Sequence, residues 1–358
     1  MRERDLEREL RQMLSDIAPR DRQTEELAQK KWNSIAKPLH SLGKLEEHVI
    51  KIAGMTGNAD VSIGKKALIV MCADNGVVAE GVTQTGQEVT AIVAENFLSA
   101  NSSAAIMCRK AGVDIFPIDI GMASDTKVPS YKIAYGTKNL AKEPAMTREE
   151  AVRAVLTGIR LVKEKKAAGY EIIATGEMGI GNTTTSSAVS AVLLGEKVKE
   201  MTGRGAGLTS EGLARKCAVI EQAVFLHQPD RDDALDVLSK VGGFDLAGLA
   251  GVYLGGAICH IPVVIDGFIS AAAALAAMSL CPVSNEYMIA SHSSKEPGMQ
   301  KILEALHLEA SLFCGMCLGE GTGAVAFLPV LELAVEVYRK MSTFSENNIE
   351  DYKELGDK

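Results

Sequence analysis

The first part of the chain carries apolar residues at helical spacing. They recur every three or four positions, as on one face of an amphipathic helix: Leu6, Leu10, Leu14 and Ile17. A second, more polar helix is predicted over residues 24–35, after which Pro38 and Gly43 interrupt the pattern. The first sixty residues are therefore expected to be mainly helical.

From residue 65 the pattern changes to short, β-branched apolar runs that end in glycine-bearing turns. Five of them are candidate strands buried on both faces: "ALIVMCADNG" (67–76), "DIFPIDIG" (114–121), "YEIIATGEMGIG" (170–181), "IPVVIDG" (261–267) and "SLFCGMCLGEGTG" (311–323). Helical stretches lie between them, clearest at 147–169, where Thr147 and Glu150 form a capping box and Gly169 ends the run. This alternation predicts an α/β fold with a Rossmann-like parallel sheet flanked by helices. Ligands of such folds bind beyond the carboxyl ends of the strands.

The longest apolar run, residues 255–280, is interrupted by His260, Pro262 and Asp266. It reads as a buried strand followed by a helix, and a membrane span is not expected.

Composition narrows the class of protein. The 358 residues are 47% hydrophobic, enough for a sizeable core, and the net charge of −8 with no dense basic stripe disfavours nucleic-acid binding. A small ligand is the expected partner. The charged N-terminus lacks the apolar core of a secretory signal, so a cytoplasmic protein is expected.

Seven cysteines, an odd number, indicate reduced thiols and no disulfide framework. Cys314 and Cys317 form one CxxC pair, but no second pair or suitably spaced His accompanies it, so no metal site is predicted. The simpler interpretation is two small residues near the end of a buried strand.

Two glycine-rich loops each follow a candidate strand and open a helix rich in small residues. They are "ATGEMGIGNTTTSSAVSAV" (174–192) and "LGEGTGA" (318–324). Backbone N–H groups and the positive end of a helix dipole favour anions, so both loops are candidate phosphate cradles, with hydroxyls from Thr183 and Thr184 as further donors. The alternative is tight turns that need glycine at positive φ. Neither a dinucleotide G-x-G-x-x-G fingerprint after the first strand nor a P-loop is present, which weakens an NAD-dependent dehydrogenase or NTPase.

Each loop holds one glutamate, Glu177 or Glu320, where a carboxylate would repel a phosphate. Desolvation in an apolar loop raises the pKa of a carboxyl group, which suits a general base near neutral pH. A helix cap or a salt-bridge partner is the alternative for either residue.

Other polar residues are candidates with a structural alternative. Asp74 follows an apolar strand, where functional side chains gather in this architecture. His292 is either a ligand or proton carrier, or a contact at a helix start. Lys216 either neutralises a phosphate or is a solvated helical lysine.

Taken together and in order, the segments resemble the nicotinate-nucleotide:dimethylbenzimidazole phosphoribosyltransferase family, which makes the lower-ligand nucleotide of cobalamin. The resemblance spans about residues 35–340 and is most specific in GEMGIGNTT and LGEGTGA. The other matching segments are Lys37-Pro38, Ser41–Glu46, Glu80–Val82, Gln87–Thr90, Gly243-Phe244-Asp245, Ser291-His292 and Glu296-Pro297-Gly298.

The resemblance implies transfer of the phosphoribosyl group of nicotinate mononucleotide to dimethylbenzimidazole or a related aromatic base, with inversion at the ribose C1′, by a homodimer without metal or organic cofactor. It also implies a smaller helical domain formed by residues 1–62 and 336–358 beside a catalytic domain of residues 63–335. Glu320 matches the catalytic base. The implied substrate-binding residues are Gln87, Glu177, Gly179, Gly181, Asn182, Thr183, Lys216, Asp245, Ser291, His292, Leu318, Gly319, Gly321 and Gly323.

The chain departs from the usual family pattern at several neighbours of these segments. Asn75 stands where His is common, His40 where Gly is usual, Ser293 and Met299 where Arg and His are frequent, and Cys317 where Arg is common. The acceptor base, a benzimidazole or a purine, and the role of Glu177 in catalysis or ribose orientation therefore stay open. A non-catalytic nucleotide-binding or regulatory protein of the same fold is the alternative function.

Overall fold

The sheet has five parallel strands in the order β2-β1-β3-β4-β5. They are β1 (Lys66–Ala73), β2 (Val113–Gly121), β3 (Ile172–Met178), β4 (Val263–Ile265) and β5 (Met288–Ala290). All eight residues of the inner strand β1 are buried, whereas β2, at the edge, exposes part of its first half. The computed structural model describes residues 3–352.

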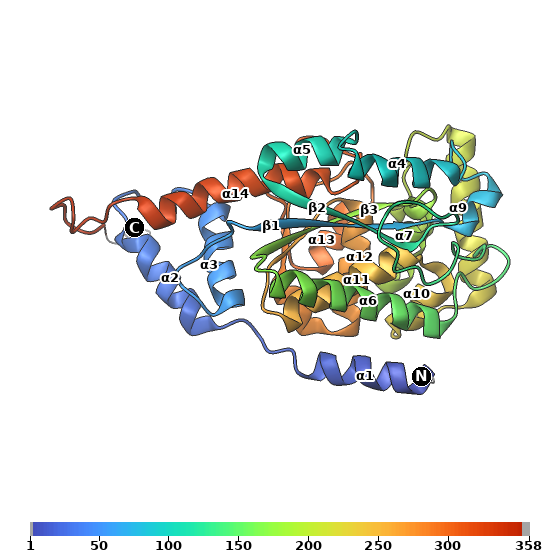
Figure 1. The fold of residues 1–358 in the computed structure, drawn as a ribbon, viewed down its shortest axis with the longest axis horizontal. Helices are drawn as coiled ribbons and strands as arrows, with labels where there is room; N and C mark the ends of the chain where they lie inside the picture. Colours follow the sequence, from blue (N-terminus) through green and yellow to red (C-terminus); the bar gives the residue numbers. More distant parts are fainter. Residues whose placement is uncertain (1–2, 353–358) are drawn as a thin grey trace.

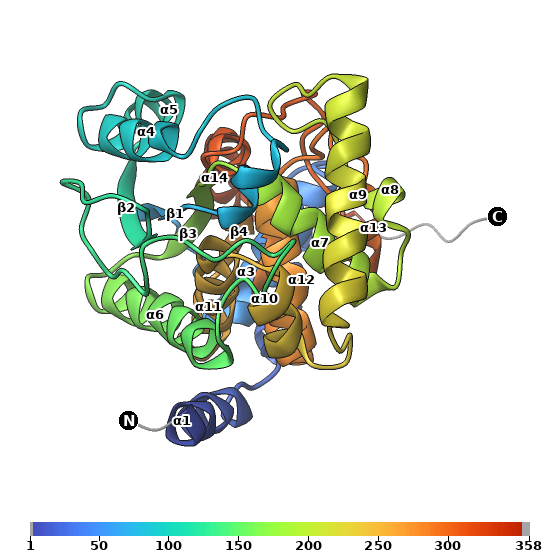
Figure 2. The ribbon, with the colours of Figure 1, turned by 90° about the vertical axis from the view of Figure 1, so that its right-hand side faces the viewer.

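Helices cover both faces of the sheet (Figures 1 and 2), as the sequence predicts. On one face lie α4 (Glu88–Leu98), α5 (Ser103–Ala111) and α14 (Thr322–Lys340); on the other lie α6 (Arg148–Ala167), α11 (Phe244–Ile258) and α12 (Phe268–Leu280). The remaining helices are α1 (Glu3–Ser15), α2 (Arg22–Ser34), α3 (Lys44–Thr56), α7 (Asn182–Leu194), α8 (Val198–Met201), α9 (Ser210–His227), α10 (Ala234–Val241) and α13 (Met299–Ala305), with 3-10 turns η1 (Gly76–Glu80) and η2 (Pro282–Tyr287). No helix between Glu3 and Tyr352 is long and apolar enough to cross a bilayer.

Several predicted elements are confirmed at residue level. Helix α6 begins with the predicted capping box: the Glu150 N–H donates to Thr147 Oγ1 (3.2 Å), and Glu150 Oε2 accepts from the Thr147 N–H (2.7 Å). The run 255–280 ends in the strand β4 and the helix α12, as expected. The predicted strand at 311–323 is wrong. Residues 311–321 form an irregular loop, and the fifth strand is the three-residue β5.

Helices α2 and α3 from the N-terminal part of the chain lie beside the last turns of α14 at one end of the molecule (Figure 1). Helix α3 packs on α2 and α14, the rings of Trp32 and Tyr338 lie 5.0 Å apart, and Ile35 forms a β-bridge with Thr343. Helix α1 is separate from this group and lies along α6 (Figures 1 and 2). The division into domains of residues 1–62, 63–335 and 336–358 stays a prediction.

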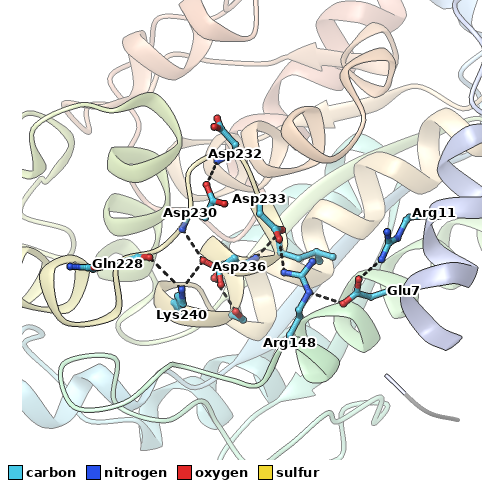
Figure 3. A network of polar contacts seen from close by, with 11 residues as sticks. Glu7, Arg11, Arg148, Gln228, Asp230, Asp232, Asp233, Asp236 and Lys240 are labelled. Carbon is cyan, nitrogen blue, oxygen red and sulfur yellow. Dashed lines mark hydrogen bonds and ion pairs between the residues drawn. The ribbon is translucent and has the colours of Figure 1, made fainter. Parts of the chain in front are cut away.

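Ion pairs attach α1 to the body of the protein (Figure 3). Glu7 accepts from Arg148 Nε (2.6 Å) and from Arg11 (2.7 Å), and Arg148 also reaches Asp233 (2.7 Å). Asp233 at the same time caps α10 by accepting the N–H groups of Leu235 and Asp236. The first turns of α6 and α10 are therefore joined to α1 through one guanidinium group.

His48 joins α3 to the loop before α14. Its Nε2 lies 2.7 Å from Ser311 Oγ, and its ring meets Phe327 of α14 edge-on at 5.4 Å. Burial, followed by the charges of Lys51 and Lys44, lowers the pKa of His48 from its usual 6.5 to about 4. Between pH 6.5 and 4 the His48 imidazole is therefore neutral in the folded protein, whereas in the unfolded chain the same imidazole is protonated.

This difference predicts acid sensitivity that depends on His48. Between pH 6.5 and 4 the unfolded state binds more protons at this position, so stability falls as the pH is lowered. At pH 4.5 the loss is on the order of 2 kcal/mol. Urea unfolding at pH 7 and pH 4.5 should show a smaller difference for His48→Gln than for the wild type. An equal difference in both proteins would contradict the prediction.

Candidate active site

A cavity of about 310 Å³ lies at the carboxyl edge of the sheet, where this architecture is expected to bind ligands. Its walls come from the loops after β3 and β4 and from residues 82–85, 204–208, 292–296 and 317–320. Of the predicted site residues, those that line it are Glu177, Gly179, Gly181, Asn182, Thr183, His292, Leu318, Gly319 and Glu320. The two glycine-rich loops (174–192 and 318–324) therefore face one space, although they are far apart in sequence.

Most of the other predicted residues lie directly behind this lining. Lys216 and Asp245 are each hydrogen-bonded to a lining residue, and Ser291 Oγ lies 3.2 Å from His292 Nδ1. Gly321 and Gly323 continue the loop into α14. Gln87 is more remote: it precedes α4, and its side-chain amide donates to the backbone oxygen of Asn75 (3.1 Å).

Glu177 is the second-last residue of β3 and lies in a buried polar cluster. The amide of Asn182 donates to Glu177 and, at 3.1 Å, to Asp245. Burial in the first place, and then the charge of Asp245, raise the pKa of Glu177 to about 8. Burial also raises the pKa of Asp245 to about 6. Glu177 therefore favours its protonated form near neutral pH and can donate that proton in a hydrogen bond.

Glu320 is held differently, at a bend of the backbone. It has φ +60°, between Gly319 at +88° and Gly321 at +85°. Left-handed backbone is rare for a residue with a side chain and is typical of functional sites. The half-buried carboxylate accepts the N–H of Ala104 at the start of α5 (3.3 Å) and lines the cavity. Burial is the main cause that raises its pKa.

Glycines let the two loops approach each other closely. A Cβ on Gly176 would lie 2.7 Å from the carbonyl oxygen of Glu320, and one on Gly319 would lie 2.5 Å from Glu177 Oε1. Any side chain at either position would push the loops apart. The tight-turn and ligand-binding interpretations of these glycines are therefore compatible, because close packing brings both glutamates to one cavity.

Lys216 is buried, so its interpretation as a solvated helical lysine is wrong. From α9 its ammonium group donates to Thr183 Oγ1 (2.8 Å) and to the Gly203 carbonyl oxygen (3.2 Å). Burial lowers the pKa of Lys216 to about 8, although the nearby negative charge of Glu296 acts in the opposite direction. The cation thus lies behind the first turn of α7, a helix that starts at Gly181 without a side-chain cap. Helix end and lysine together make this corner favourable for an anion.

Sequence reasoning missed two residues that line the cavity, Asp266 and Arg204. Asp266 follows β4, so the signal that singled out Asp74, an acidic residue directly after a buried strand, applies to it as well. Arg204 lies in an exposed loop and donates to the Leu208 carbonyl oxygen and Ser210 Oγ. Nothing in its local pattern distinguishes it from a surface arginine.

The positions that depart from the family pattern divide into two kinds. Cys317 lines the cavity, whereas Asn75 is buried with its amide 3.4 Å from the Ile180 carbonyl oxygen, and Met299 is buried at the start of α13. Cys314 and Cys317 are both exposed on the irregular loop, so their placement near the end of a buried strand is wrong. Between residues 3 and 352 no group of three or more His, Cys, Asp or Glu side chains is arranged to hold a metal ion.

The sequence and the fold have close counterparts among known proteins. Residues 17–349 match the sequence model of a family described as "Phosphoribosyltransferase", which makes this protein an enzyme of that class. Nicotinate-nucleotide–dimethylbenzimidazole phosphoribosyltransferase of Acetivibrio thermocellus is 47% identical over 345 residues, which cover 96% of this chain and 98% of the relative. The protein of the same name from Clostridium acetobutylicum is 48% identical over 330 residues, covering 91% and 94%.

The solved structure of a nicotinate-nucleotide–dimethylbenzimidazole phosphoribosyltransferase from Thermus thermophilus is 36% identical with a TM-score of 0.87, and the match covers 92% of this chain and 99% of the other. The chain therefore belongs to the nicotinate-nucleotide:dimethylbenzimidazole phosphoribosyltransferase family.

Proposed function

We propose that the protein transfers the phosphoribosyl group of nicotinate mononucleotide to dimethylbenzimidazole or a related aromatic base, giving nicotinate and α-ribazole phosphate. The observation that carries the proposal is the half-buried Glu320 carboxylate, which faces the same cavity as the anion-favouring start of α7. The names of the relatives support the choice of substrates.

The chemistry requires one base and no general acid. Nicotinate leaves from a pyridinium as a neutral ring nitrogen when its bond to the ribose C1′ breaks. The benzimidazole nitrogen that bonds to C1′ gains positive charge, and Glu320 relieves that charge by accepting the proton from the second ring nitrogen. Attack opposite the leaving group converts the β linkage to α. A carboxyl whose pKa is raised by burial is better matched to this proton transfer than a solvated one.

The phosphate is assigned to the corner formed by the start of α7. Lys216 and the hydroxyl of Thr183 lie 2.8 Å apart, and both can turn their donors to a phosphate there. An approaching dianion would stabilise the ammonium form of Lys216 and oppose the burial that lowers its pKa to about 8. This arrangement holds the phosphate by protein groups alone.

Glu177 is assigned to orienting the ribose. With a pKa of about 8 it carries its proton at neutral pH, and so it makes a poor base but a good donor to a hydroxyl oxygen. Asn182 fixes it from behind. The two glutamates then have separate tasks, which their different burial supports.

The acceptor base is assigned to the apolar part of the cavity. Its lining there consists of Val82, Val93, Met178, Leu208, Phe268, Ile269 and Leu318. Such a lining suits a flat aromatic ring and does not discriminate sharply between benzimidazoles, since one methyl group in an apolar pocket changes binding by about 1–3 kcal/mol. The identity of the base therefore stays open between benzimidazoles and purines.

A homodimer in the cytoplasm is part of the proposal. Three neighbouring helices, α4, α5 and α14, expose the large apolar side chains of Ile92, Ile106 and Leu333, each more than half accessible in the single chain. Exposed apolar surface of this kind favours association. The seven cysteines are all unpaired, which fits a reducing compartment.

An acceptor panel tests the proposal against the non-catalytic alternative. Purified protein with nicotinate mononucleotide should release nicotinate when dimethylbenzimidazole, another benzimidazole or a purine is added, with products resolved by mass. Without an acceptor, release should be at least about 100-fold slower, because the base is what attacks C1′. Tight binding of the mononucleotide with no release for any acceptor would instead support a binding or regulatory protein.

A further inference from the structure

The catalytic loop depends on a residue that is distant in sequence. Gly321 occupies the N-cap position of helix α14 and has no side chain to cap the helix. Asp266, at the end of β4, takes that place: its carboxylate accepts the N–H groups of Gly321 (3.2 Å) and Ala324 (2.9 Å). A helix capped from another strand is fixed in position relative to that strand.

Glu320 directly precedes this cap. Its backbone lies in the left-handed region together with both neighbours, so the loop alone does not favour one conformation strongly. The Gly321 N–H held by Asp266 belongs to the peptide that starts at the Glu320 carbonyl carbon. The direction of the Glu320 side chain therefore depends on where Asp266 holds this peptide.

Asp266 is built into its place from a second side. The Asp266 side chain is 2% exposed, and burial raises its pKa. The charge of His292 opposes this rise most strongly, followed by backbone N–H groups of α14. His292 lies against the first turn of that helix, since a Cβ on Gly323 would collide with its Nδ1. The Ser291 hydroxyl donates to the Ile265 carbonyl oxygen (2.6 Å) and lies 3.2 Å from the same ring nitrogen.

We propose that Asp266 is the positioning residue for Glu320: it holds the start of α14 so that the carboxylate meets the acceptor base in line with the ribose. This inference rests on the proposed function, because it requires Glu320 to be the base. It assigns Asp266 no contact with the reacting atoms. Its effect should therefore appear in turnover and depend on Glu320.

Asp266→Asn tests the inference. Asparagine has nearly the same shape, but its NH₂ group would face one of the two N–H donors, so the first turn of α14 should shift. A misplacement of about 1 Å can lower the rate of an oriented reaction by about 100-fold. We expect kcat to fall about 10- to 100-fold, with the KM for nicotinate mononucleotide within about threefold of the wild type, since the phosphate corner is untouched.

The decisive comparison repeats Asp266→Asn in the Glu320→Gln background. If Asp266 acts through Glu320, the Asp266→Asn substitution should lower the residual kcat of the Glu320→Gln variant by less than about threefold. The effects of substituting residues that act as a unit are not additive. An equal fall in both backgrounds, or no fall in either, would overturn the inference and leave the base assignment intact. A Glu320→Gln variant as active as the wild type would overturn the base assignment, and the inference with it.

Asp233→Asn is the matched control. Asp233 also accepts two N–H groups at a helix start, at 3.1 and 3.2 Å, but it lies outside the cavity, in the network of Figure 3. Both N–H groups donate to the single oxygen Oδ1 of Asp233, which asparagine retains, whereas the N–H groups at Asp266 use both carboxylate oxygens. The kcat and KM of Asp233→Asn should therefore stay within about twofold of the wild type. Should Asp266→Asn fail to fold, as judged by thermal unfolding, Asp266→Glu replaces it. Asp266→Glu keeps the charge but is longer by one methylene, which displaces the two N–H groups. The results expected for this variant, and those that would overturn the inference, are the same as for Asp266→Asn.

Discussion

Glu320→Gln is expected to lower kcat about 100- to 10,000-fold, the range in which a positioned general base contributes. Glutamine keeps the size of the side chain and an oxygen that can still accept the Ala104 N–H, but it cannot take a proton from the attacking base. The KM for nicotinate mononucleotide should change little, because the phosphate corner and the ribose-orienting cluster are separate from this residue. Steady-state release of nicotinate with saturating dimethylbenzimidazole measures the effect.

Glu309→Gln is the control for this variant. Glu309 precedes the same irregular loop and pairs with Lys44 at 2.6 Å on the surface, outside the cavity. Its replacement should leave kcat unchanged. Both variants should unfold within a few degrees of the wild type, since neither removes apolar contacts. Wild-type turnover in Glu320→Gln would refute the assignment of the base.

Lys216→Met is expected to raise the KM for nicotinate mononucleotide about 10- to 100-fold, since a charge-assisted hydrogen bond to phosphate contributes about 1.5–3 kcal/mol. Methionine has a similar length and suits a site where the lysine is fully buried, so the fold should be retained. Nicotinate riboside, which lacks the phosphate, should be used equally well by both proteins. A comparison of the two substrates therefore separates phosphate binding from general damage to the site.

Lys51→Met provides the matched control for a buried lysine. Burial also lowers the pKa of Lys51, to about 7, but Lys51 belongs to α3, donates to the Met288 carbonyl oxygen (2.6 Å) and does not line the cavity. Its KM for nicotinate mononucleotide should equal that of the wild type. An unchanged KM in Lys216→Met, or an equal loss with the riboside, would show that Lys216 does not bind the phosphate.

The sequence predicts those parts of the fold that local patterns determine. The inner strand β1 is a continuous apolar run because both of its faces are covered, and α6 carries its own capping box. Both features are visible within about ten residues of chain. The apolar run at 311–318 resembles a strand for the same reason, yet glycines at positive φ, Gly315 (+65°) and Gly319 (+88°), bend it. The strand β5 has only three residues and offers no periodicity to detect.

The residues of the candidate site were predictable where a glycine-rich motif follows directly after a strand. They were less predictable where hydrogen bonds link segments that are distant in sequence. Glu177 and Glu320 follow from the glycine-rich loops. The burial of Lys216 depends on its contact with Thr183, 33 residues earlier, and a polar helical pattern does not reveal it. Asp266 caps a helix that begins more than fifty residues later. Such pairings are decided by the packing of the whole sheet and not by neighbouring residues.

Two glutamates in one cavity have different protonation because their surroundings differ. Glu177 is fully enclosed with Asp245 close by and keeps its proton near neutral pH, whereas Glu320 is half-buried and accepts a single backbone N–H from α5. In the proposed reaction this difference resolves the difficulty of carboxylates beside a phosphate: Glu177 is neutral, and Glu320 is assigned to the incoming base. The exposed Cys317 beside Leu318 lines the same cavity and carries no charge that would bind a phosphate.

The most direct test of the account is the structure of the product formed by the wild-type enzyme. Nicotinate mononucleotide in the β configuration and dimethylbenzimidazole should give equal amounts of nicotinate and α-ribazole phosphate, with the α linkage at C1′ read from NMR of the isolated nucleotide. The account predicts complete inversion by a single attack assisted by Glu320. A β-linked product, or ribose phosphate and nicotinate with no new nucleotide, would contradict it.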